Sequence, residues 1–291
     1  MSPTAKRRKK QRRMRKFPDE PAKRAFFCEC TAAAFAAAGI ASIEFLWPGP
    51  PPRAGQFFLV KPRRTGVFLG RPISVSGWKP GQTADGGTVR FLVARQGQGS
   101  RELADLKPGE EAELIGPLGN YWAAAEIFAG SPESLPPIAL IGGGVGIAPL
   151  LAFAGELTDS AQGSVSPKRV LFDFYAGFRS APFGLETLNP PNARSLVIAT
   201  EDGCEGAKGR VTEFFAPSGY GGVFACGPEP MLRAIRDACA ASTVPCFISV
   251  ERHMACGVGA CLGCTVKTTG GNQRCCVEGP IFDAGEVCFD A

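Results

Sequence analysis

Cysteines near the C-terminus constrain this 291-residue chain more than any other feature. Cys256, Cys261 and Cys264 follow a C-x4-C-x2-C spacing, and the adjacent Cys275 and Cys276 come shortly after them. The spacing is that of plant-type [2Fe–2S] sites, whose irons are held by soft thiolates. A zinc site is the main alternative, although zinc ribbons usually pair two C-x2-C knuckles. We therefore expect a small [2Fe–2S] segment over residues 248–291, with one of the two adjacent cysteines as its fourth ligand.

The remaining composition narrows the class of protein. Twelve cysteines in so long a chain are too sparse for a disulfide scaffold, and they favour a reducing, cytoplasmic location. The single histidine, His253, argues against a histidine-rich metal site and a Ser-His-Asp triad. No stretch reaches the roughly 18 apolar residues of a membrane span. Glu29 interrupts the apolar run around the Ala-rich stretch 31–42, so we expect neither a secretory signal nor a membrane contact.

The net charge of +5 comes from the N-terminus. Residues 1–24 carry 11 Lys and Arg against 2 Asp and Glu, whereas the rest of the chain carries 21 against 25. Such a basic run could bind nucleic acid or an acidic partner, and a zinc-stabilised nucleic-acid-binding module is the non-enzymatic alternative. We expect a solvated, disordered tail and no nucleic-acid partner.

Residues 25–133 have the pattern of a small antiparallel β-barrel. Short apolar runs at 43–47, 56–60 and 89–94 alternate with Pro- and Gly-rich turns. The sequence Arg71-Pro-Ile-Ser offers a guanidinium and a hydroxyl to a phosphate, or it is an ordinary edge strand containing a proline. Two further glycine-rich turns, 97–100 and 116–120, indicate loops by themselves.

Residues 134–247 change to an alternation typical of a parallel α/β sheet. Expected strands cover 138–141, 170–175, 196–199, 223–226 and 246–250, and expected helices cover 150–157 and 231–240. The first strand runs into a glycine loop before a helix, an arrangement that binds a pyrophosphate through backbone N–H groups; a plain tight turn is the alternative. Its candidate nucleotide-binding residues are Gly142, Gly144, Gly146 and Pro149, the last replacing the final glycine of G-x-G-x-x-G.

Two further positions lie at the carboxyl ends of expected strands, where open α/β sheets bind ligands. Cys226, Gly227 and Pro228 follow one strand and are candidate nucleotide contacts; a buried cysteine before a helix is the alternative. Glu201 and Asp202 follow another strand and could accept ribose hydroxyls while repelling a 2′-phosphate, which favours NAD over NADP. A charged turn explains them equally well.

The order of these motifs resembles the ferredoxin-reductase superfamily and, within it, the electron-transfer subunits of NAD-dependent dihydroorotate dehydrogenase. The nearest local matches are residues 251–264 and 276–283. The resemblance implies an FAD-binding barrel, an NAD-binding α/β domain and a [2Fe–2S] segment. It also implies a catalytic FMN-containing partner that oxidises dihydroorotate in pyrimidine biosynthesis, in a heterotetramer with two of each subunit. Dihydroorotate chemistry would then need no catalytic residue of this chain.

The resemblance also carries over individual residues. It places FAD contacts at Arg71, Pro72, Ile73, Ser74, Leu92, Val93, Ala94, Gly99 and Ser100. It places cluster ligands at Cys256, Cys261, Cys264 and Cys276, the last because it directly precedes an x-[DE]-G-P turn. Ala94 stands where some relatives have an arginine. A NAD(P)H:ferredoxin or sulfide dehydrogenase-type iron–sulfur flavoprotein would use the same parts with another partner.

Overall fold

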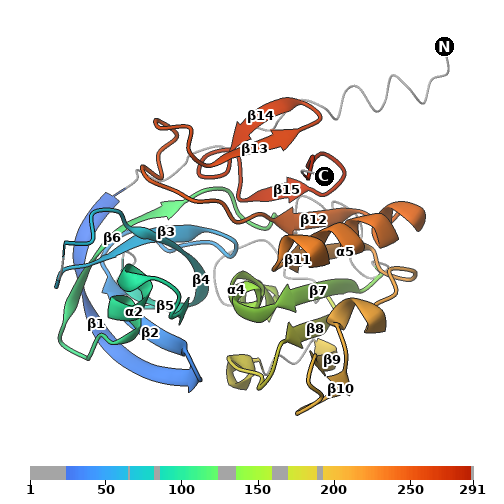
Figure 1. Ribbon diagram of the computed structural model, residues 1–291, viewed down its shortest axis with the longest axis horizontal. Coiled ribbons are helices and arrows are strands. Elements are labelled where there is room, and N and C mark those ends of the chain that lie inside the picture. The colour runs from blue at the N-terminus through green and yellow to red at the C-terminus, as the bar shows by residue number, and fades with distance from the viewer. Residues whose placement is uncertain are drawn as a thin grey trace.

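A barrel, a helix-flanked sheet and a C-terminal segment make up the computed structural model, which describes residues 24–64, 66–81, 86–123, 136–158, 170–188 and 193–289 (Figure 1). Six antiparallel strands close the barrel in the order β1-β2-β5-β4-β3-β6. Its elements are β1 (Arg24–Ala37), β2 (Ile40–Trp47), β3 (Phe57–Pro62), β4 (Arg71–Pro80), β5 (Gly87–Ala94), α2 (Gln98–Ala104) and β6 (Glu111–Leu118).

Aromatic side chains fill the barrel because alternate residues of its strands point inward. The ring of Phe58 lies edge-on at 4.8 Å from that of Trp47 and 5.6 Å from that of Phe91. All three side chains are almost fully buried. Each edge-to-face pair adds about 0.5–1.5 kcal/mol beyond the burial of its area. The barrel therefore has a core of its own, and its closure leaves no free strand edge.

A seven-stranded sheet lies beside the barrel in the order β10-β9-β8-β7-β11-β12-β15. Its neighbours pair in parallel, except for β12 and β15, which pair antiparallel. The strands are β7 (Ile138–Gly143), β8 (Phe172–Phe178), β9 (Ala193–Thr200), β10 (Ala207–Lys208), β11 (Gly222–Cys226), β12 (Cys246–Ser249) and β15 (Ile281–Asp283). Short 3-10 helices cover Leu185–Thr187 and Val211–Phe214.

Helices α4 (Ile147–Thr158) and α5 (Glu229–Ala241) cover opposite faces of this sheet. Along β7, Ile138 and Leu140 join the core beneath α4, whereas Ala139 and Ile141 join the core beneath α5. Strands buried on both faces explain the continuous apolar runs in the sequence. Leu92 of the barrel belongs to the same core as α4, so this helix is packed between the barrel and the sheet (Figure 1).

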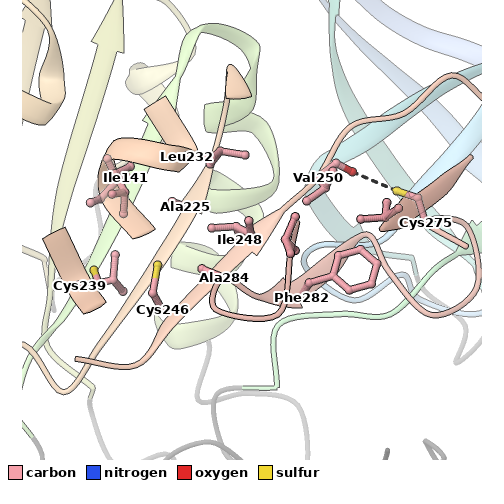
Figure 2. Packing of buried hydrophobic residues seen from close by; sticks show 14 of the residues in the cluster. Ile141, Ala225, Leu232, Cys239, Cys246, Ile248, Val250, Cys275, Phe282 and Ala284 are labelled. Carbon is pink, nitrogen blue, oxygen red and sulfur yellow. Dashed lines mark hydrogen bonds between the residues drawn. The ribbon is translucent and has the colours of Figure 1, made fainter. Parts of the chain in front are cut away.

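The C-terminal segment returns to both parts of the molecule. It contains the hairpin of β13 (Thr265–Thr268) and β14 (Gly271–Arg274), then adds β15 to the edge of the sheet. Figure 2 shows Phe282 and Ala284 from this segment packed with Ile248 of β12 and Leu232 of α5. The segment that carries the cysteines therefore shares its core with the sheet.

The expected antiparallel barrel followed by an α/β sheet and a C-terminal segment is confirmed. The antiparallel β15 was not foreseen, because residues 251–291 show no clear periodicity. The Ala-rich stretch 31–42 forms the end of β1 and the turn into β2. The expected basic tail lies outside the described residues, except for Arg24, which begins β1. No helix in the described ranges has the length and apolar character needed to cross a bilayer.

Candidate cofactor sites

The four predicted cluster cysteines lie as two pairs. The backbone N–H of Cys261 donates to Cys256 Sγ at 3.4 Å, and the two side chains are also within hydrogen-bonding range. The thiols of Cys264 and Cys276 interact as a second pair, and the charge of Cys256 also acts on Cys276, so the two pairs adjoin each other. Among the described residues, no three His, Cys, Asp or Glu side chains surround a position for a single metal ion. Two thiolates on each of two irons is the arrangement of a [2Fe–2S] cluster, and the two cysteine pairs supply that donor set.

Cys275 points away from these pairs. Its Sγ donates to the carbonyl oxygen of Val250 at 3.0 Å, and its side chain is fully buried in the core shared with the sheet (Figure 2). Burial, followed by the nearby charges of Cys264 and Cys276, raises the pKa of Cys275. Cys276 is equally buried and its pKa is raised as well, so burial does not separate the two thiols; their neighbours do, because Cys276 lies beside Cys264 and Cys275 beside Val250 O. The geometry thus supports Cys276 as the fourth ligand.

The loop around Cys256 stabilises negative charge on sulfur. Burial opposes ionisation, but backbone N–H groups of Cys261, Val258 and Ala260 outweigh it and lower the pKa of Cys256 to about 6. The loop can turn so tightly because Gly257 has a φ of +65°. A Cβ on Gly257 would lie 2.8 Å from Leu59 Cδ1 and 2.9 Å from Leu118 Cδ1. This loop therefore rests directly on β3 and β6 of the barrel.

Arg274 and Glu278 connect the two cysteine pairs. The backbone N–H of Arg274 donates to Glu278 Oε2 at 2.6 Å, and its guanidinium pairs with the same carboxylate. Arg274 Nη1 also donates to the carbonyl oxygen of Gly259 at 3.3 Å. One arginine thus joins the turn that carries Cys276 to the loop that carries Cys256, and places a positive charge beside the thiolates.

The predicted flavin residues come together in part. Arg71 to Ser74 form the start of β4 and are half-buried. A Cβ on Gly99 would lie 2.9 Å from Arg71 Nε and 3.0 Å from Arg71 Nη2, so the guanidinium covers the first turn of α2. Arg71 Nη1 donates to Leu69 O at 3.1 Å, and the guanidinium has further N–H donors available for a phosphate. This arrangement fits the pyrophosphate of FAD.

Other predicted flavin residues have side chains that contact the protein itself. The hydroxyl of Ser100 accepts from the backbone N–H groups of Gln96 and Gly97 at 3.0 Å, and it donates to Gly97 O at 3.1 Å. It therefore shapes its own loop. Leu92 and Val93 are buried in two different cores, as adjacent residues of a strand must be. Their side chains face protein, which leaves their backbone and the half-buried Ala94 as the groups available to a flavin.

The two predicted nucleotide loops lie in direct contact. Gly142 pairs with Cys226 across β7 and β11. A Cβ on Gly146 would lie 2.4 Å from Cys226 O and 2.7 Å from Gly227 Cα. Gly144 has a φ of +55°, and a Cβ there would meet open space. The loops are packed together at Gly146, where no side chain would fit, and they are open at Gly144. An open glycine loop of this kind fits the close approach of a nucleotide.

The remaining predicted nucleotide residues lie at the same edge of the sheet, after β9 and β11 and at the start of α4. Pro149 lies in the first turn of α4, and Pro228 precedes α5. The thiol of Cys226 is buried, and burial raises its pKa, followed in effect by nearby Glu251. After β9, the backbone N–H of Cys204 donates to Asp202 Oδ1 at 3.0 Å and lowers the pKa of that carboxyl. Asp202 therefore carries a negative charge at the exposed end of β9.

Sequence reasoning missed two residues at this site. Asn120, from the turn treated as a simple loop, contacts the turn that follows Cys276. Arg274, directly before the cysteine pair, holds the two ligand segments together. The closeness of Arg274 to Cys275 in the sequence was an available signal. Asn120 ends the Gly-Pro-Leu-Gly-Asn turn, one of the motifs behind the family resemblance, but its contacts could not be predicted because its partners lie 158 and 161 positions away.

Comparison with known proteins agrees with this geometry. Residues 251–288 match the iron–sulfur cluster binding domain of dihydroorotate dehydrogenase B. The chain is 39% identical over 236 residues to the dihydroorotate dehydrogenase B (NAD(+)) electron transfer subunit of Clostridium perfringens, covering 81% of this chain and 87% of that protein. The subunit of the same name from Clostridium acetobutylicum is 37% identical over 238 residues, covering 82% and 87%.

Solved structures show the same fold at lower identity. The NADH-dependent reduced ferredoxin-NADP oxidoreductase, studied for flavin-based electron bifurcation, superposes with a TM-score of 0.68 at 23% identity, covering 90% of each chain. The ferredoxin reductase of carbazole 1,9a-dioxygenase gives 0.60 at 20% identity, covering 77% of this chain and 68% of that one. With the cysteine segment and the curated relatives in agreement, the chain belongs to the family of dihydroorotate dehydrogenase B (NAD(+)) electron transfer subunits.

Proposed function

We propose that this chain passes electrons from the FMN of a catalytic dihydroorotate dehydrogenase subunit, by way of a [2Fe–2S] cluster and FAD, to NAD+. The observation that carries the proposal is the arrangement of four cysteines as two pairs, resting on the barrel that presents Arg71. The sheet beside them presents the glycine loop. Family membership makes this function better supported than a NAD(P)H:ferredoxin or sulfide dehydrogenase role.

Each group of residues has a defined task. Arg71 and the loop before α2 hold the pyrophosphate of FAD, and the start of β4 supports the rest of that cofactor. The loops at Gly144 and Gly227 bind the phosphates and the nicotinamide end of NAD. Cys256, Cys261, Cys264 and Cys276 ligate the cluster. A bound flavin exchanges a hydride with NAD and single electrons with an iron–sulfur cluster, which makes it the converter between the two.

The partner supplies the oxidation of dihydroorotate. We propose an FMN-containing catalytic subunit and a heterotetramer with two of each chain, acting in the cytoplasm, where thiolate ligands stay reduced. The names of the relatives support a partner, because each is called an electron transfer subunit. The domains proposed for this work are a tail over 1–24, the FAD barrel over 25–133, the NAD domain over 134–247 and the cluster segment over 248–291.

Co-expression with an FMN-containing catalytic subunit tests the proposal. The complex is purified without oxygen, its iron, sulfide, FAD and FMN are counted, and dihydroorotate-dependent reduction of NAD+ is measured. We expect about two iron and two sulfide ions for each copy of this chain, one FAD, and activity only with both chains present. A chain that binds these cofactors but reduces ferredoxin, and ignores the catalytic subunit, would favour the alternative.

A further inference from the structure

The turn at residues 116–120 ties the barrel to the turn that follows Cys276. The side-chain Nδ2 of Asn120 donates to Glu278 O at 2.9 Å and to Ile281 O at 2.8 Å, and its Oδ1 accepts from the backbone N–H of Ile281 at 2.9 Å. Its own backbone N–H donates to Gly279 O at 2.7 Å. A single barrel residue therefore makes hydrogen bonds to three residues of the cluster-binding segment.

The residue types in this contact are closely constrained. Gly119 has a φ of +74°, and a Cβ there would lie 2.6 Å from Pro280 Cδ and 2.8 Å from Gly279 O. Only glycine allows the two backbones to come this close. Asn120 supplies two donors and an acceptor on one short side chain, a combination that aspartate and alanine lack. Gly279 and Ile281 are buried, so water is a poor substitute for these hydrogen bonds.

The loop that carries Asn120 is itself fixed to the proposed flavin strand. The buried side chain of Gln56 donates from Nε2 to Gly119 O at 3.0 Å and accepts from the backbone N–H of Arg53 at 2.9 Å. The carbonyl oxygen of Gln56 accepts from the backbone N–H of Val75 at 3.0 Å. Val75 follows Ser74 directly in β4, so hydrogen bonds lead from this strand to the loop of Asn120.

The turn that follows Cys276 is also connected to the loop between Cys256 and Cys261. The carbonyl of Glu278 is held by Asn120, and its carboxylate is held by Arg274. Arg274 in turn donates to the carbonyl oxygen of Gly259. The network therefore connects the barrel with the turn of Cys276 and, through Arg274, with the loop between Cys256 and Cys261.

We propose that Asn120 is a positioning residue that sets the place of the cluster-binding turn relative to the flavin strand. The identity of the two cofactors rests on the proposed function, whereas the contact made by Asn120 does not. Electron transfer between two bound groups falls steeply with their separation. Releasing this turn should therefore slow transfer between flavin and cluster while the reaction of NADH with the flavin stays intact.

The test uses the complex with the catalytic subunit and the substitution Asn120→Asp, which keeps the size of the side chain and removes both donors. Asn272→Asp makes the same change at an exposed position of the β13–β14 hairpin and serves as the matched control. Hydrogen exchange of residues 276–283 is measured first. Stopped-flow absorbance then follows flavin reduction by NADH, and freeze-quench electron paramagnetic resonance follows reduction of the cluster.

For Asn120→Asp we expect the amide of Ile281 to exchange about tenfold faster, because the carboxylate replaces both donors with an oxygen that the carbonyl groups of Glu278 and Ile281 repel, which moves the side chain away from the turn. FAD and iron content and the rate of flavin reduction should match the wild type, while cluster reduction slows at least about fivefold. Asn272→Asp should change none of these. Unchanged exchange at Ile281, or equal slowing of flavin and cluster reduction, would overturn the proposal.

A second variant covers the case in which Asn120→Asp does not fold. Asn120→Ser keeps one hydroxyl that can donate, and it should give a smaller slowing of cluster reduction in the same direction; wild-type kinetics in this variant would count against the proposal. A wild-type complex without iron or flavin would instead refute the proposed function. The exchange comparison would still decide whether Asn120 holds the turn.

Discussion

Cys275 and Cys276 differ by one position in sequence and by the direction of their side chains. Cys275 points into the core and donates to Val250 O, whereas Cys276 pairs with Cys264. The sequence alone gave no physical reason to choose between them, because both follow the same strand. The choice depends on where β12 ends relative to β14, which is a tertiary relation.

Serine substitutions should separate the two cysteines. Cys276→Ser removes one of four thiolates, so iron and acid-labile sulfide should fall to a small fraction of the wild-type content. Cys275→Ser should keep the full cluster, since it changes no ligand. It should still lower the free energy of unfolding by about 1–3 kcal/mol, because a hydroxyl is less favourable than a thiol in this apolar setting. Metal analysis and thermal unfolding of both variants provide the measurement; full iron in Cys276→Ser would refute the ligand assignment.

Asp173 is a second residue whose surroundings fix its chemistry. Burial raises its pKa, but hydrogen bonds from Arg194 and from Tyr220, the latter at 2.6 Å, outweigh burial and leave the pKa lowered. Tyr220 is also hydrogen-bonded to Tyr175 at 2.8 Å. This network lies at the start of β8 and β9, at the opposite end of the sheet from the nucleotide loops, so it serves stability.

The free energy of unfolding should depend on pH through the ionisation of Asp173. Because its folded pKa lies below its unfolded value of about 3.9, its contribution is fully present above that pH and is lost as the pH falls through the folded pKa. Asp173→Asn should lower the free energy of unfolding by about 1–3 kcal/mol near pH 7. The difference from the wild type should shrink below about pH 4. Denaturant unfolding at several pH values measures this difference in free energy between the variant and the wild type. A difference that grows on acidification would contradict the lowered pKa of Asp173.

At the scale of elements, helix-start preferences explain the shape of the glycine loop in the predicted nucleotide site. Helix α4 begins at Ile147, three residues before the expected start, because Pro149 lies in the first turn, where its missing N–H is not needed. The departure of Pro149 from the glycine fingerprint is thus compatible with a helix. The contact of Gly146 with Cys226 lies beyond sequence reasoning, since it depends on the pairing of β7 with β11.

Two glycine-to-alanine substitutions on neighbouring elements should act in opposite directions. Gly146→Ala places a Cβ 2.4 Å from Cys226 O, so the two loops must separate. We expect a loss of about 1–3 kcal/mol in stability and a rise of at least about tenfold in the KM for NADH. Gly155→Ala, within α4, meets no atom within 4 Å and should stabilise the helix by about 0.5–1 kcal/mol. Thermal unfolding and steady-state kinetics measure both; an unchanged KM in Gly146→Ala would argue against the site.

At the scale of the whole molecule, the order of parts was predictable because each part has its own periodicity or spacing. Alternating short strands indicated the barrel, strand–helix alternation indicated the sheet, and the cysteine spacing indicated the cluster. What could not be predicted is how the last segment joins the others. Asn120 and β15 both connect residues whose meeting depends on the assembled barrel and sheet, and their sequence neighbourhoods give no sign of it.

The basic N-terminal run should prove separable from this assembly. All residues assigned here to flavin, nucleotide and cluster lie between Arg71 and Cys276, well beyond it. Deleting residues 1–20 should leave cofactor content, association with the catalytic subunit and NAD+ reduction within about twofold of the wild type. Loss of association, measured by co-purification at matched salt, would show that the run contributes to the partner interface.

The place of β15 at the sheet edge has a consequence for biosynthesis. Domains fold as they leave the ribosome, N-terminal parts first. The barrel strands and β7 to β12 are complete before Cys276 and Ile281 have been translated. A product that stops short of these residues can close its barrel, yet it lacks one cluster ligand and the final strand of its sheet. Acquisition of iron and sulfide therefore marks a chain that has been translated past Cys276, and it makes assembly of the electron carrier a late event in synthesis.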